Sequence, residues 1–113
     1  MKKLMLFVGL LIFFASCNAT KKVAAIEGVD FITSEKLTPI LEMADSKNKL
    51  VFVDFYTTWC LPCKMMDEDV FPDKGISELM NDNFVSYKVN AEKGNGPNLA
   101  ALYQVVAYPT LLF

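Results

Sequence analysis

Residues 50–64 read L-V-F-V-D-F-Y-T-T-W-C-L-P-C-K, and this stretch decides the fold. Its first seven residues are nearly all apolar, β-branched or aromatic, which is typical of a central strand covered on both faces. Residues 57–62 form a connection, and we expect a helix over residues 63–69. Cys60 and Cys63 therefore lie where a buried strand is followed by a helix, as in an α/β domain.

The spacing of Cys60 and Cys63 favours redox chemistry. Two intervening residues allow a small, reducible disulfide ring, and the start of a helix favours the thiolate form of a cysteine. Since the thiolate is the nucleophile in disulfide exchange, we expect Cys60 to attack and Cys63 to resolve the mixed disulfide. A C-x-x-C pair is also half of a zinc site, but the chain has no His and its other cysteine, Cys17, is distant. We therefore predict a redox dithiol that uses neither a metal nor a cofactor.

Further elements follow on both sides of this stretch. Periodicity and turn residues predict strands and helices in alternation, with strands over 28–33, 84–90 and 110–113 and helices over 38–47, after Asp73 and from Pro97. We expect Thr38 to be the N-cap of the helix over 38–47. The order predicts an α/β fold with a mixed or parallel sheet flanked by helices. Because the sequence ends just as a strand begins, we expect a fold truncated at its C-terminus, without a last hairpin strand and closing helix.

Side-chain alternation assigns faces to two of these elements. In the strand over 84–90, Val85, Tyr87 and Val89 share one face, and Ser86 and Lys88 share the other. In the helix after Asp73, we expect the inward side chains to be Ile76, Leu79 and Met80.

Two motifs together resemble the thioredoxin superfamily. Residues 53–64, V-D-F-Y-T-T-W-C-L-P-C-K, look like its active-site stretch, and residues 103–113, Y-Q-V-V-A-Y-P-T-L-L-F, look like its second signature. Residues 65–82 are most similar to the thioredoxin-like domains of DsbD-type periplasmic reductases. The resemblance implies a thioredoxin fold and a thiol–disulfide oxidoreductase.

The resemblance also implies roles for individual residues. Pro109 matches the family's cis-proline beside the cysteines, and the backbone of Tyr108 would pair with a substrate chain like an added strand. Trp59 matches the aromatic shield before the first cysteine. Residues between the two cysteines help to set the redox potential, and they are Leu61, where cytosolic thioredoxins have Gly, and Pro62, which is usual in reductants of the family.

Asp54 matches the family's buried acid, six residues before Cys60. A carboxyl group within an apolar strand is costly to ionise, so burial should raise its pKa. We expect Asp54 to accept the proton of Cys63 during resolution. The alternative is a hydrogen-bonded carboxyl group without a chemical role.

The first residues read as a targeting segment. Two lysines precede a short apolar run, and F-A-S-C at residues 14–17 resembles a bacterial lipobox. We predict a lipoprotein-type signal peptide over residues 1–16, lipidation of Cys17, a tether over residues 17–27 and a thioredoxin-like domain over residues 28–113. This places the protein in a bacterial cell envelope, facing the periplasm and anchored to a membrane by lipid.

These features lead to one preferred function. The formal net charge of −2 gives no electrostatic basis for nucleic-acid binding. We predict a monomer that reduces disulfides in protein substrates and is recharged by a membrane electron donor of the DsbD type, because the envelope lacks a cytosolic reducing pool. The alternatives are an oxidase or isomerase with the same fold, and a lipid-tethered binding module without enzymatic activity.

Overall fold

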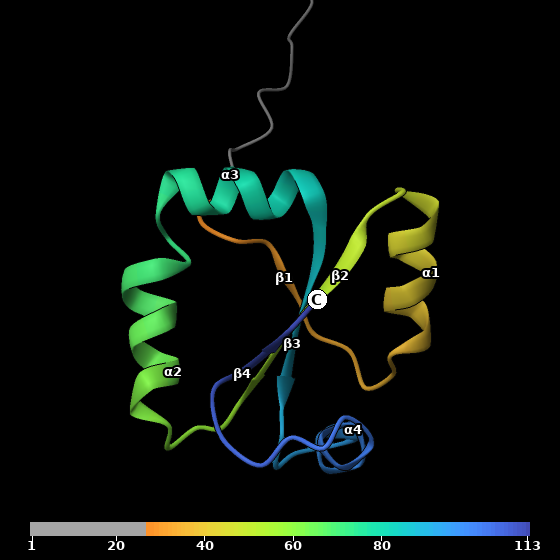
Figure 1. Cartoon of the computed structure of the whole chain (residues 1–113), viewed down its shortest axis with the longest axis vertical. Helices are drawn as coiled ribbons and strands as arrows, with labels where there is room; N and C mark the ends of the chain where they lie inside the picture. The colour runs from red at the N-terminus through yellow and green to blue at the C-terminus, as the bar shows by residue number, and fades with distance from the viewer. Residues whose placement is uncertain (1–26) are drawn as a thin grey trace, which may run out of the picture.

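A computed structural model of the chain describes residues 27–113 (Figure 1). The predicted signal peptide and all of the predicted tether except Glu27 lie outside these residues. The elements in chain order are β1 (Phe31–Ile32), α1 (Thr38–Ser46), β2 (Leu50–Tyr56), α2 (Leu61–Met65), the π-helical η1 (Met66–Val70), α3 (Lys74–Asn83), β3 (Phe84–Asn90), α4 (Gly96–Leu102) and β4 (Thr110–Leu112). The predicted α/β fold is confirmed.

The four strands form one mixed sheet in the order β1-β3-β2-β4. β1 and β2 run parallel to β3, and β4 runs antiparallel to β2. The predicted central strand is therefore central, since β2 has a partner on each side. The register sets Asp54 of β2 beside Lys88 of β3.

Helices cover both faces of the sheet (Figure 1). α1 and α4 lie over the face that carries Val53 and Phe55 of β2, and α3 and η1 lie over the face that carries Phe52. The prediction for β3 is confirmed on the first face, where Val85, Tyr87 and Val89 are buried, whereas Ser86 and Lys88 lie under the second helical layer. On this second face, Asp54 of β2 and Lys88 of β3 therefore lie close to Asp67 of η1.

Several local predictions were wrong in detail. The strand predicted over 28–33 is reduced to the two residues of β1. α1 begins at Thr38 with Leu37 as its N-cap, because Pro39 fits the first turn. The helix predicted over 63–69 begins at Leu61 and widens into η1 over Met66–Val70. Leu79 is 62% exposed, because α3 turns Ser77 and Met80 toward the sheet.

Ile76, which was also predicted to point inward, is 36% exposed, so that prediction was wrong as well, whereas the prediction that Met80 points inward is confirmed. Residues three apart on a helix share a face. Ser77 and Met80 share the face of α3 that points toward the sheet, and Leu79 lies outside that face.

Within residues 27–113, no helix combines the length and the apolar character that crossing a membrane requires.

Candidate functional site

The dithiol lies at the carboxyl end of the central strand, where β2 passes through a short turn into α2. Cys60 is the N-cap of α2, and Cys63 lies one turn inside the helix. The two sulfurs form a disulfide, with 5.3 Å between the Cα atoms. The Cys63 amide donates a hydrogen bond to the Cys60 Sγ over 3.2 Å. Cys60 therefore stands at the helix start, as the sequence predicted, and both cysteines are buried beneath the surrounding side chains.

An apolar rim surrounds the disulfide. Trp59 and Leu61 are 65% and 67% exposed, and Pro62 is also exposed. The Trp59 ring meets the Tyr108 ring edge-on, with 6.1 Å between centroids. The Tyr108–Pro109 peptide bond is cis, as predicted. The rim thus joins residues from both sequence motifs into one exposed, largely apolar surface.

Glu92 borders this apolar rim, and no motif in the sequence had singled it out. Trp59 Nε1 donates a hydrogen bond to Glu92 Oε1 over 2.9 Å. Glu92 follows β3 and Trp59 follows β2, so the bond ties together the loops at the ends of two neighbouring strands. Together with the edge-on contact to Tyr108, this bond restricts the rotation of the exposed indole ring.

Asp54 lies in the middle of β2, beneath the second helical layer. It is 2% exposed, and its Oδ1 has no hydrogen-bond partner among the described residues. Burial raises the pKa of its carboxyl group above the ordinary value of 3.8, while the charge of Lys88 lowers it by a smaller amount. The predicted burial and the predicted direction of the pKa shift are both confirmed.

Lys88 is the charged partner of Asp54. Its Nζ lies 3.5 Å from Asp54 Oδ2, and the same amine bonds Asp67 Oδ1. Sequence reasoning placed Lys88 on a strand face but did not pair it with Asp54, because that pairing depends on strand register. Asp67 was missed although a signal existed: it lies four residues after Cys63, and residues with that spacing share a helix face.

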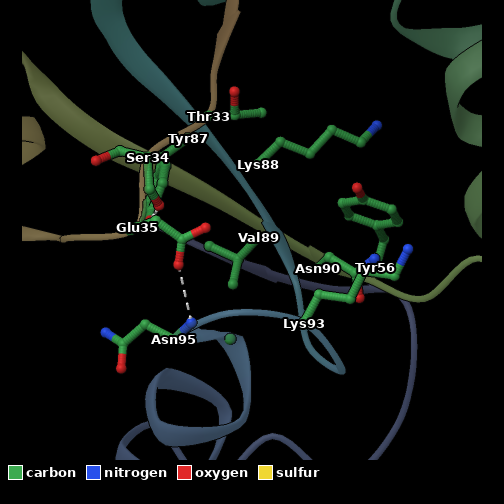
Figure 2. A pocket seen from close by; sticks show the side chains of 11 residues that line it. Thr33, Ser34, Glu35, Tyr56, Tyr87, Lys88, Val89, Asn90, Lys93 and Asn95 are labelled. Carbon is green, nitrogen blue, oxygen red and sulfur yellow. Dashed lines mark hydrogen bonds between the residues drawn. The ribbon is translucent and has the colours of Figure 1, made fainter.

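A cavity of about 370 Å³ opens beside Lys88, at the carboxyl ends of β2 and β3. Tyr56 and Asn90, the last residues of these strands, line it together with residues of the loops before α1 and α4 (Figure 2). Glu35 accepts a hydrogen bond from the Asn95 amide across the cavity mouth. Lys88 therefore lines this cavity and also contacts the buried Asp54 carboxyl group.

Comparison with known proteins places this arrangement in a family. The Thioredox_DsbH family, described as a protein family of unknown function, DUF255, matches residues 22–110. The chain belongs to this family, within the thioredoxin superfamily. As a thioredoxin-like protein with a Cys60–Cys63 pair at disulfide distance, it has the fold and the reactive group of a thiol–disulfide oxidoreductase.

Individual relatives agree with this assignment. The thioredoxin-like protein R548 of Acanthamoeba polyphaga mimivirus is 34% identical over 99 residues, which are 85% of this chain and 64% of that protein. The thiol:disulfide interchange protein DsbD of Salmonella typhi is 34% identical over 73 residues, which are 63% of this chain and 13% of DsbD. The chain thus spans less than two thirds of either protein.

Solved structures show the same fold. A putative disulphide-isomerase from Bacteroides thetaiotaomicron is 42% identical, with a TM-score of 0.68 over 77% of this chain and 71% of that one. A thioredoxin from Thermus thermophilus is 27% identical, with a TM-score of 0.65 over 74% of this chain and 62% of that one.

Within residues 27–113, no three His, Cys, Asp or Glu residues lie close enough together to bind a metal ion.

Proposed function

We propose that this thioredoxin-like protein reduces disulfides of protein substrates in a bacterial cell envelope. The observation that carries the proposal is the dithiol itself. Cys60 caps the start of a helix within W-C-L-P-C, Cys63 lies one turn later, and a buried carboxyl group sits in the adjoining strand. Helix dipole and unpaired amides at such a position favour a thiolate, which is the form that attacks disulfides.

The proposed reaction has two displacement steps. The Cys60 thiolate attacks one sulfur of the substrate disulfide, and the other substrate sulfur leaves as a thiolate that takes a proton from water. Asp54 then accepts the Cys63 proton, and the Cys63 sulfur attacks Cys60, closing the protein disulfide and releasing the second substrate sulfur as a thiolate, which takes up the proton that Asp54 holds. The substrate gains two electrons and two protons, and the protein dithiol is oxidised.

The exposed rim supplies the docking surface in this proposal. Trp59, Leu61 and Pro62 would contact apolar side chains of the substrate, and the Tyr108 backbone would pair with an extended substrate segment. The apolar character of the rim and its position around the disulfide support this assignment.

The place of action is also part of the proposal. The lipobox-like sequence supports a signal peptide over residues 1–16, lipidation of Cys17 and a tether that holds a monomeric domain at the membrane. A membrane electron donor of the DsbD type would return two electrons to the oxidised pair, since an envelope compartment lacks a cytosolic reducing pool.

Insulin disulfide reduction in the presence of a chemical reductant tests the activity. We expect the wild-type protein to accelerate insulin precipitation and the Cys60→Ser variant to lose that acceleration. Cys17→Ser is the matched control, because it makes the same substitution outside the dithiol and should keep full activity in solution. A Cys60→Ser variant as active as the wild type would end the proposal.

The Bacteroides thetaiotaomicron neighbour favours a second candidate, an isomerase of the same fold, because it is described as a putative disulphide-isomerase. The reduction potential of the pair separates the candidates. A value near about −270 mV, as in thioredoxin, supports a reductase, whereas a value near about −180 mV, as in protein disulfide isomerase, supports the alternative.

A further inference from the structure

Lys88 stands between two carboxylates that come from different elements. Its Nζ is 3.5 Å from Asp54 Oδ2 on the neighbouring strand β2, and it also bonds Asp67 Oδ1 on η1. The two acids differ in environment, because the side chain of Asp54 is 3% exposed and that of Asp67 is 42% exposed. One ammonium group therefore forms ion pairs with a buried acid and with a partly exposed acid at the same time.

Aromatic rings hold this ammonium group in place. Lys88 Nζ lies 4.9 Å from the ring centroid of Phe31, 5.1 Å from that of Tyr56 and 5.5 Å from that of Phe71. Cations within about 6 Å of a ring centroid are attracted to the ring face. These rings and the two carboxylates restrict the position of the amine. A change at either acid therefore alters the electrostatic interaction between Lys88 and the other acid.

We propose that Asp67 is a positioning residue for the resolving step: it holds Lys88 and thereby sets how much of the lysine's positive charge Asp54 receives. This inference rests on the proposed function, in which Asp54 takes the Cys63 proton. It extends that function to a residue in the π-helical turn η1. Widened turns of this kind occur frequently at functional sites.

With two acids beside it, the positive charge of Lys88 would face at least one carboxylate at every stage of the reaction. While Asp54 is ionised, both carboxylates face the lysine. Once Asp54 has taken the proton from Cys63 it is neutral, and Asp67 alone balances the ammonium group. Without Asp67, that group would be left largely buried with no ionised partner, and removing one partner of a buried pair is costly.

The charges that act on Asp54 come from two elements. Among the described residues these are Lys88 from β3, which lowers the pKa of Asp54, and Asp67 from η1, which raises it. The residue opposite Asp54 on β4 is Leu111, which is apolar. Removing the Asp67 charge should thus lower the pKa of Asp54 both directly and by leaving Lys88 to pair with Asp54 alone.

Stopped-flow kinetics of the full chain can isolate the resolving step. The reduced protein is mixed with an aromatic disulfide whose thiol is coloured, so that attack by Cys60 releases one chromophore and resolution by Cys63 releases the second. The rate of the second release is followed from mildly acidic to mildly basic pH. Variants are Asp67→Asn, the matched control Asp69→Asn in the same turn, Lys88→Gln, and each of the two aspartate variants combined with Lys88→Gln.

Asp67→Asn should move the acid limb of the resolution rate to lower pH. A displacement of half a pH unit would appear as about a threefold faster release at a fixed pH on that limb. Lys88→Gln alone should move the limb the other way. Because Asp67 acts through Lys88, the gain from Asp67→Asn should fall to less than half in the Lys88→Gln background, and Asp69→Asn should match the wild type.

The outcomes separate this inference from the proposed function. An Asp67→Asn profile that overlays the wild type, or an equal gain with and without Lys88, would overturn the positioning role while leaving the reductase intact. A wild-type protein that never releases the second chromophore would overturn the proposed function itself. If Lys88→Gln fails to fold by circular dichroism, Lys88→Met supplies the apolar replacement that keeps the coupling measurable.

Discussion

Asp54→Asn should stabilise this protein at neutral pH while slowing its chemistry. The wild-type carboxylate is 2% exposed, has one oxygen without a hydrogen-bond partner among the described residues, and has one lysine at 3.5 Å. An amide of the same shape removes the buried charge. It also leaves the pair between Lys88 and Asp67 in place, so no uncompensated ammonium group is created.

The magnitude follows from two opposing effects. The attraction between Asp54 and Lys88 over 3.5 Å is about 5 kcal/mol at an effective dielectric constant of about 20. Removing a carboxylate from water costs several kcal/mol, and here burial outweighs the lysine, since the pKa of Asp54 is raised. Replacing buried ionic groups gains up to about 1–4 kcal/mol in other proteins, so we expect Asp54→Asn to raise the free energy of unfolding by about 1–3 kcal/mol.

The gain should depend on pH with a definite sign. A carboxyl group whose pKa is higher in the folded state than in the unfolded state binds more protons when folded, so wild-type stability falls as pH rises through that folded pKa. Below the ordinary value of 3.8, both states are protonated and the stability contribution of Asp54 to folding is at its greatest. The advantage of Asp54→Asn should therefore be present at neutral pH and shrink in acid.

Urea unfolding at neutral and acidic pH measures this difference. For a domain of this size, each kcal/mol corresponds to about 4–8 °C in Tm, so a thermal scan should show the gain as well. A variant that is less stable than the wild type at neutral pH, or equally more stable at both pH values, would refute the assignment of Asp54 as a buried, destabilising charge.

Three further variants test the fold and the rim. Phe52→Ala should lower the free energy of unfolding by about 3–5 kcal/mol in urea, because its buried ring packs against three other aromatic rings. Gly96→Ala should lower it by about 3 kcal/mol, since an added Cβ would lie 1.7 Å from the carbonyl oxygen of Asn90. Glu92→Ala should change stability by less than about 1 kcal/mol but speed the decay of Trp59 fluorescence anisotropy, as the indole loses its acceptor.

The parts of the fold that depend on local sequence could be predicted. The apolar run of β2 and the C-x-x-C pair at the next helix are contiguous features, so their relation needed no knowledge of the tertiary structure. The alternation likewise predicted that Val85 and Tyr87 share one face of β3, and the structure buries that face. Residues 1–26, including Cys17, lie outside the structure, and their roles stay predictions.

Features that depend on register or helix rotation could not be predicted with the same success. Lys88 reads as a solvated strand residue until the parallel register places it beside Asp54. Leu79 was predicted to be a core residue because it is apolar. The rotation of α3 about its axis turns Met80 toward the sheet but leaves Leu79 exposed. The spacing of Asp67 from Cys63 indicates a shared helix face, but its contact with Lys88 depends on how η1 packs against β3.

The reduction potential of the Cys60–Cys63 pair, measured by equilibration with redox buffers and thiol alkylation, tests the central claim most directly. We expect a fully reversible two-electron transition between dithiol and disulfide, near about −270 mV. A pair that stays permanently open or permanently closed across the accessible range would contradict the redox role, and a potential near about −120 mV would contradict its direction.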